Sequence, residues 1–136
     1  MTDDLKDNVR PLYAALAAAD ADASRALVAA DVVDHNPDPD QGPGIDGVIE
    51  AFRATQAGFP DLTVEVLRVI AEGDIVASHA VFRGTHTGEY MGVPPTGKAI
   101  EVEVVDMTRW EGGKLAERWG VFDVATMMGQ LGLLPD

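Results

Sequence analysis

One aspartate stands where a strand-like segment passes directly into a helix-like one. Residues 115–122 alternate in the manner of a strand, and a period of two would place on one face Leu115, Glu117, Trp119, Val121 and Asp123. A carboxyl group beside an indole and away from bulk water has its charged form disfavoured, so its pKa rises. Asp123 is therefore a candidate general acid or base. The same position also suits a helix N-cap, and both roles stay open.

Three histidines supply the other side chains that titrate near neutral pH. His35 lies in the proline- and glycine-rich loop 34–47, where it could relay a proton, polarise a carbonyl group or simply bond the loop backbone. His79 lies within a strand-like segment, and we favour a histidine satisfied in the core over a pocket donor. His86 stands between two glycines and is predicted to be a turn residue.

Signatures of other chemistries are not found in the sequence. The histidines show none of the spacings typical of metal ligands, so no metal site is expected. The glycines within 84–97 match neither a dinucleotide-binding fingerprint nor a phosphate-binding loop, and no cofactor is predicted. Neither serine lies in the sequence context of a hydrolase nucleophile, and the chain has no cysteine.

The elements that must position these residues change their hydrophobic period once along the chain. Helices are predicted from Leu5 to about Leu16, over 22–30, over 48–58 and over 123–131, and strands over 63–71, 75–83, 99–110 and 115–122. Helices followed by a strand meander predict an α+β domain. We expect a cone-shaped barrel, made of a curved antiparallel sheet packed against the N-terminal helices, with a C-terminal helix. Its open mouth is where chemistry would take place.

Length and charge narrow the classes of partner. A chain of 136 residues predicts one domain, residues 1–136. Ten Lys and Arg against 23 Asp and Glu give a net charge of −13, which repels phosphate backbones and anionic lipid headgroups. We therefore expect no nucleic-acid and no membrane partner. The polar N-terminus and the missing cysteines favour a cytoplasmic location.

Several short motifs together resemble, in order and spacing, the SnoaL-like polyketide cyclases. They are Asp34-His35-Asn36-Pro37, Phe59-Pro60-Asp61, Gly73-Asp74, Gly84-Thr85-His86-Thr87-Gly88, Pro95-Thr96-Gly97-Lys98, Gly113-Lys114-Leu115 and Glu117-Arg118-Trp119 with Asp123. The resemblance implies the cone-shaped fold of the nuclear transport factor 2-like superfamily and a homodimer through the outer sheet face. It also implies cofactor-free intramolecular aldol closure of a ring in a hydrophobic polyketide ester.

Residue by residue, the resemblance places the acid–base carboxylate at Asp123 and a pocket-facing histidine at His35. The expected substrate pocket is lined by Trp119, His79, Phe59, Tyr13 and Met107. The cyclases support their acid with polar side chains on the neighbouring strand, where this chain has Val105-Asp106-Met107-Thr108-Arg109. If Asp106 faces the pocket, two carboxyl groups share the site; if Met107 does, the polar partner is missing. The sequence leaves the choice among Asp106, Met107 and Arg109 open.

Two alternatives belong to other classes. An epoxide hydrolase on the same fold uses two aspartates and an arginine to activate water, and Asp106, Asp123 and either Arg109 or Arg83 supply those residue types. A non-catalytic pocket that binds a small hydrophobic molecule needs only apolar residues. A normal, solvent-like Asp123 would favour this binding protein.

Overall fold

Four α-helices and five strands make up residues 5–134, the part of the chain that the computed structural model describes. The helical elements are a 3₁₀ turn η1 (Leu5–Asn8), α1 (Val9–Ala17), α2 (Ala21–Leu27), α3 (Gly44–Gly58) and α4 (Val124–Gln130). The strands are β1 (Val28–Asp34), β2 (Thr63–Glu72), β3 (Ile75–Thr85), β4 (Ala99–Glu111) and β5 (Lys114–Phe122). Because α1 begins at Val9, Pro11 lies in its first turn, where the missing N–H has no partner to lose.

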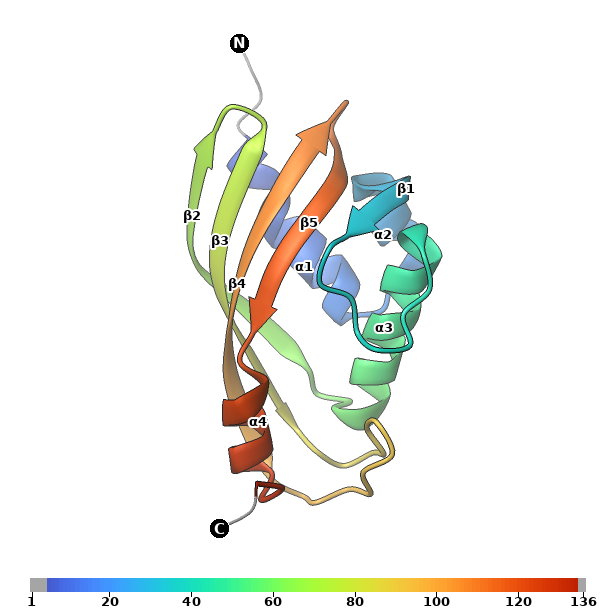
Figure 1. Cartoon of the computed structure of the whole chain (residues 1–136), viewed down its shortest axis with the longest axis vertical. Coiled ribbons are helices and arrows are strands. Elements are labelled where there is room, and N and C mark those ends of the chain that lie inside the picture. Colours follow the sequence, from blue (N-terminus) through green and yellow to red (C-terminus); the bar gives the residue numbers. More distant parts are fainter. Residues whose placement is uncertain (1–4, 135–136) are drawn as a thin grey trace.

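The strands form one curved sheet in the order β1-β5-β4-β3-β2 (Figure 1). Strands β2 to β5 are antiparallel, whereas β1 pairs with β5 in parallel, so the sheet is mixed and does not close into a barrel. The α+β cone fold is thus confirmed, with a mixed, open sheet in place of the antiparallel barrel. Strand β1 was not predicted from the sequence. Its apolar residues continue the spacing of the preceding helix, and its pairing with β5 is a tertiary contact that local sequence does not indicate.

Helices α1, α2 and α3 lie on one side of the sheet, and α4 follows the end of β5 (Figure 1). We call the sheet face that packs on the N-terminal helices the inner face. Core and exposed side chains alternate most regularly in β4, where burial switches at every residue from Ala99 to Thr108. Asp106 falls on the buried side of this alternation, and Met107 falls on the outer face. Of the three residues left open, Asp106 therefore faces inward and Met107 and Arg109 face outward; Thr108 also faces inward.

A bulge in β5 decides which of its side chains point inward. Arg109 pairs with Glu117 while the next residue, Trp110, pairs with Leu115, so Ala116 is an extra residue in the ladder. Leu115 is consequently buried, but Glu117 and Trp119 join the outer face opposite Arg109 and Met107. The prediction that Leu115, Glu117, Trp119 and Asp123 share one face is wrong for this reason. Within residues 5–134, no helix has the length and apolar character needed to cross a membrane.

Candidate functional site

Three charged side chains from neighbouring strands meet on the inner face of the sheet. Arg118 of β5 donates from Nη2 to Oδ1 of Asp106, on β4, over 2.9 Å. Its Nη1 donates to both carboxylate oxygens of Asp34, the last residue of β1, at 3.1 and 3.3 Å. Because β5 lies between β1 and β4, one planar guanidinium bridges the strands on both sides. We call these residues the Asp34–Arg118–Asp106 cluster.

Burial sets the protonation chemistry of this cluster. Asp106 is 3% exposed, and its burial raises the pKa of the carboxyl group, although Arg118 partly lowers it. Burial alone would lower the pKa of Arg118, but the carboxylates of Asp106 and Asp34 outweigh it and raise that pKa. Arg118 therefore stays a cation. Beyond its bond to Arg118, the carboxyl group of Asp106 has no other hydrogen bond within residues 5–134.

The loop after β1 braces the cluster from the other side. Gln41 donates from Nε2 to Asp34 Oδ2 at 3.0 Å and accepts the backbone N–H of Asp38 at 3.1 Å. Asn36 donates its backbone N–H to Asp34 Oδ1, and its side-chain oxygen accepts the N–H of Gly120 at 3.0 Å. Burial raises the pKa of the Asp38 carboxyl; nearby Arg118 lowers it and Asp34 raises it. Asp34 is thus the fully bonded end of the cluster.

Aromatic side chains cover much of the same inner face. The Phe82 ring contacts those of Tyr13, Phe52 and Phe122, with centroids 6.3, 6.3 and 5.5 Å away. Phe122 pairs with Val104 and therefore lies on the same face as the pair formed by Gly120 and Asp106. Two predicted lining residues, Tyr13 and Phe59, are buried here. These aromatic side chains thus share the inner face with the carboxyl group of Asp106.

Asp123 lies in a different setting. It is exposed, and its side chain caps α4 by accepting the backbone N–H of Thr126 at 3.1 Å and the Thr126 hydroxyl at 2.6 Å. These two hydrogen bonds lower the pKa of its carboxyl group, the Thr126 hydroxyl having the larger effect. The expected rise in the pKa of Asp123 is therefore wrong, and the helix-cap interpretation is confirmed. A catalytic role of Asp123 stays a prediction that these contacts do not test.

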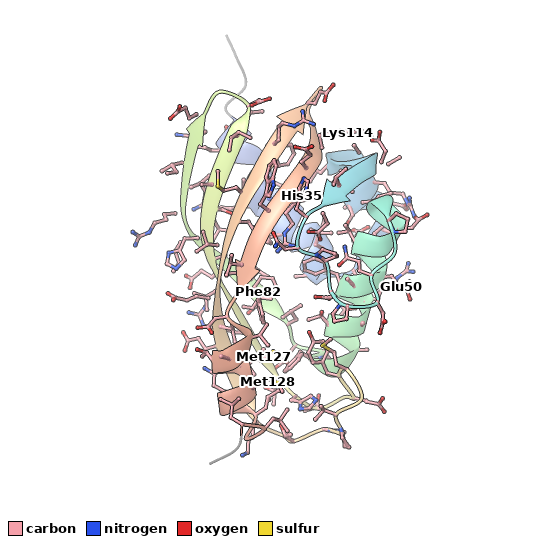
Figure 2. The ribbon with its side chains drawn as sticks, viewed as in Figure 1. His35, Glu50, Phe82, Lys114, Met127 and Met128 are labelled. Carbon is pink, nitrogen blue, oxygen red and sulfur yellow. The ribbon has the colours of Figure 1, made fainter. Side chains whose placement is uncertain are left out.

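His35 lies on the outer face, beside β5 (Figure 2). Its ring is stacked on Trp119 with centroids 4.8 Å apart and planes 4° from parallel, and its Nε2 is 4.0 Å from the Glu117 carboxylate. Two further predicted lining residues share this face. His79 is 3.1 Å from Glu103, and Met107 is 47% exposed. The structure thus separates His35, Trp119, His79 and Met107 from Asp106 by the thickness of the sheet, and the preferred core position of His79 is wrong.

His86 is fully buried, which the prediction of a turn residue did not anticipate. Its Nδ1 accepts the backbone N–H of Thr96 at 3.2 Å, and its ring stacks on Phe59 with centroids 5.2 Å apart. An accepting Nδ1 leaves the ring proton on Nε2. That Nε2–H has no hydrogen-bond partner. His86 therefore fixes the connection between β3 and β4 and offers no accessible donor.

Arg118 and Asp34 were not predicted as site residues from the sequence. Arg109 and Arg83, the arginines considered for a two-aspartate site, lie on the outer face and pair with Glu111 and Glu117, and with Glu65 and Glu101. A usable signal was Asp106 itself, a lone carboxylate in the apolar series Ile100, Val102, Val104, because a buried charge requires a partner. Because the bulge in β5 changes the face of the residues that follow it, the sequence pattern does not indicate which arginine is that partner.

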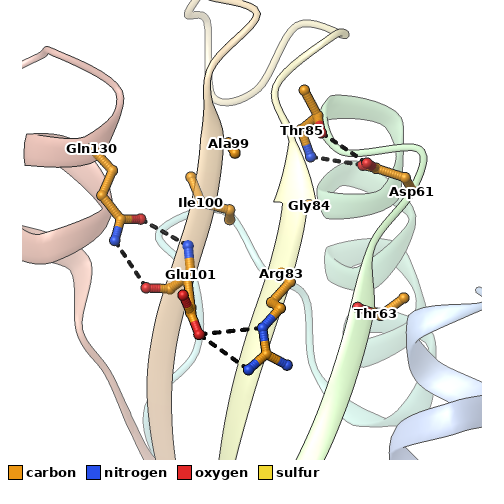
Figure 3. Close-up of a pocket in the computed structure, with 9 residues that line it drawn as sticks. All are labelled: Asp61, Thr63, Arg83, Gly84, Thr85, Ala99, Ile100, Glu101 and Gln130. Carbon is orange, nitrogen blue, oxygen red and sulfur yellow. Dashed lines mark hydrogen bonds and ion pairs between the residues drawn. The ribbon is translucent and has the colours of Figure 1, made fainter.

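Two hollows adjoin the sheet. One of about 550 Å³ lies on the outer face beside α4, and its polar side chains already pair with one another: Arg83 with Glu101, Thr85 with Asp61 and Gln130 with the Glu101 backbone (Figure 3). The other, of about 700 Å³, lies between β1 and the following loop, and Asp34 and Gln41 line part of it. Among residues 5–134, no three His, Asp or Glu side chains are grouped so that they could hold a metal ion. The second hollow reaches the braced end of the Asp34–Arg118–Asp106 cluster.

Comparisons with known proteins agree with the fold. The family model of the SnoaL-like polyketide cyclases matches residues 6–131, and the chain belongs to that family. IdmH, a proposed polyketide cyclase of Streptomyces antibioticus, is 38% identical, with 96% of this chain and 99% of IdmH covered at a TM-score of 0.83. AclR, a proposed hydroxylase of Streptomyces galilaeus, is 30% identical over 97% of this chain and 87% of its own, also at 0.83. No curated protein matches the sequence significantly.

Proposed function

We propose that this protein is a cofactor-free acid–base enzyme that closes a ring in a hydrophobic polyketide-type molecule, with Asp106 as the proton-transfer group. One observation carries the proposal: the Asp106 carboxyl group is buried on the inner face, its pKa is raised, and Arg118 holds one of its oxygens. A pKa moved toward the working pH suits a general base. Membership of a cyclase family supports the type of reaction.

The proposed step is an intramolecular aldol reaction. The Asp106 carboxylate takes the proton from a carbon next to a carbonyl group, and the carbanion attacks a second carbonyl of the same molecule to form the new C–C bond. The resulting alkoxide oxygen then receives the proton back from Asp106, so substrate and product are isomers. Arg118 keeps Asp106 ionised often enough to act and fixes its orientation. The aromatic side chains around Phe82 exclude water and favour a flat substrate.

The test is a panel of aromatic polyketide esters, each with an acidic α-carbon and an acceptor carbonyl. Ring closure is followed by absorbance, and mass spectrometry must show a product of unchanged mass. Asp106→Asn should abolish turnover while binding of the ester, measured by calorimetry, stays within a few-fold. Undiminished turnover by Asp106→Asn would overturn the assignment, and Asp123, with His35 as donor, would then be the competing pair.

Epoxide hydrolysis is the second candidate, and the Asp34–Arg118–Asp106 cluster favours it, because two carboxylates share one arginine. Here one carboxylate would activate water and a protonated carboxyl would donate to the epoxide oxygen. Incubation of an epoxide panel in ¹⁸O-labelled water separates the two reactions, since only hydrolysis places one labelled oxygen in a diol. If both panels give binding without turnover, the protein is a small-molecule carrier.

We further propose that two copies associate through the outer face as a homodimer. Large apolar side chains are exposed there on three adjacent strands: Val33, Met107, Val105 and Val121, at 46, 47, 51 and 72%. The Arg109–Glu117 ion pair and the His79–Glu103 hydrogen bond border them. An apolar centre with a polar rim is the pattern of a protein interface, and a second copy presents the same pattern.

A further inference from the structure

A glycine occupies the position of β5 that faces Asp106. The two residues are direct cross-strand partners in the β4–β5 ladder, where neighbouring Cβ atoms ordinarily lie about 4.5–5.5 Å apart. Glycine in a strand interior costs conformational entropy and removes a packing contact, so its presence needs a reason. Gly120 is not among the residues with positive φ, and its backbone is one that any residue adopts. The reason must therefore be space.

The space next to Gly120 is filled by the charged groups of the cluster. A Cβ built on Gly120 would overlap Oδ1 of Asp106 and Nη2 of Arg118, the two atoms that form the ion pair. Arg118 precedes Gly120 by two residues on the same face, so its guanidinium crosses over the bare Cα to reach β4. Any side chain at this position would stand in its path.

The backbone at Gly120 is itself held in place from the opposite edge. Strand β1 ends at Asp34, and the Asn36 side chain then supplies the acceptor for the Gly120 N–H at 3.0 Å. Strand β5 therefore stays extended past the end of its neighbour. We infer that Gly120, with its N–H held by Asn36, is a positioning residue that admits the Arg118 guanidinium to Asp106. Its catalytic meaning rests on the proposed function.

The test is Gly120→Ala, with the Asp106 carboxyl titrated by ¹³C NMR and its signal assigned from Asp106→Asn. Displacing Arg118 removes the group that lowers the pKa of Asp106, so the titration midpoint should move upward by about one unit or more. The acidic limb of any turnover profile should move with it. Because this titration needs no substrate, it tests the role of Gly120 even if the proposed function is wrong.

The matched control is Gly84→Ala on β3. Its new Cβ would meet the Phe59 Cβ at 3.0 Å, so it also crowds a buried strand glycine, but away from the cluster. Gly84→Ala should lower the midpoint of thermal unfolding and leave the titration of the Asp106 carboxyl group unchanged. A folded Gly120→Ala protein whose Asp106 titration and pH profile match the wild type would overturn the inference.

A second variant covers the case in which Gly120→Ala does not fold. In Asp106→Ala/Gly120→Ala the carboxyl group is gone and the guanidinium is free to move aside, so folding should return. If Asp106→Ala folds and the double variant does not, the methyl group acts on something other than the ion pair, and the inference fails.

Discussion

The two faces of the sheet carry the same types of charged residue with different consequences. On the outer face, Arg83, Arg109 and His79 pair with glutamates that are mostly exposed, and pairs of this kind contribute about 0–1 kcal/mol each. On the inner face one arginine serves two carboxylates that are nearly out of contact with water. Burial, rather than the presence of an ion pair, is what makes the second group a candidate for chemistry.

Asp106 and Asp123 show the same contrast at the level of one carboxyl group. Burial raises the pKa of Asp106, whereas hydrogen bonds from Thr126 lower the pKa of the exposed Asp123. The first group is thereby moved toward the pH at which proton transfer is efficient, and the second is moved away from it. Four predictions test how far this contrast between the faces holds.

The largest effect is expected on turnover of a ring-closing substrate. Asp106→Asn should lower kcat by about 10²–10⁴-fold, the usual contribution of a positioned general base. Asp123→Asn should change kcat less than about threefold, because hydrogen bonds from Thr126 hold this exposed carboxylate as a helix cap. Steady-state kinetics on both variants, each checked by circular dichroism, decide between them. A larger loss of kcat in Asp123→Asn than in Asp106→Asn would instead assign the acid–base role to Asp123.

The next effect is on stability. Arg118→Met keeps the length of the side chain but leaves Asp34 and Asp106 buried without their cation, at a cost of about 3 kcal/mol in the free energy of unfolding. Arg83→Met, on the outer face, should cost less than about 1 kcal/mol. Urea unfolding at pH 7 measures both. Equal losses would mean that the two faces do not differ as described.

The pH dependence of stability should have opposite signs for the two aspartates. The raised pKa of Asp106 means that its folded form favours the proton, so the stability of wild type relative to Asp106→Asn should fall as pH rises above about 4. The lowered pKa of Asp123 means that wild type should lose its advantage over Asp123→Asn as pH falls below about 4. Urea titrations from pH 3 to pH 7 test both slopes. Slopes of the same sign would contradict the contrast.

The smallest effect on catalysis is expected from His35. His35→Ala should change kcat less than about threefold, since the imidazole is stacked on Trp119 across the sheet from Asp106. A loss of 100-fold in His35→Ala would show that the outer face takes part in chemistry.

The proposed homodimer is tested with Val121→Glu, which should give monomers by light scattering. The control variant Met91→Glu, in the β3–β4 connection, should leave the dimer intact.

Most elements followed from periodicity, and the candidate site followed only in part. The four antiparallel strands and α4 lie within a residue or two of their predicted bounds, because their alternation and the glycine turns are local signals. Asp106 was among the residues considered, but Arg118 and Asp34 were not. Their meeting depends on the parallel β1–β5 pair and on the extra residue in β5, and neither leaves a mark in local sequence.

The extra residue in β5 has a wider consequence for comparing members of this family. Without Ala116 the ladder would keep Leu115 opposite Trp110 and Glu117 opposite Arg109, so simple alternation would return and Arg118 would stay on the inner face. If Ala116 were instead to join the ladder opposite Arg109, every later residue of β5 would change face, so that Trp119 would turn inward and Arg118 outward. An indole would then stand where the guanidinium now meets Asp106. Loss of the bulge at constant length would therefore exchange the interior, whereas loss of the bulged residue would leave it unchanged.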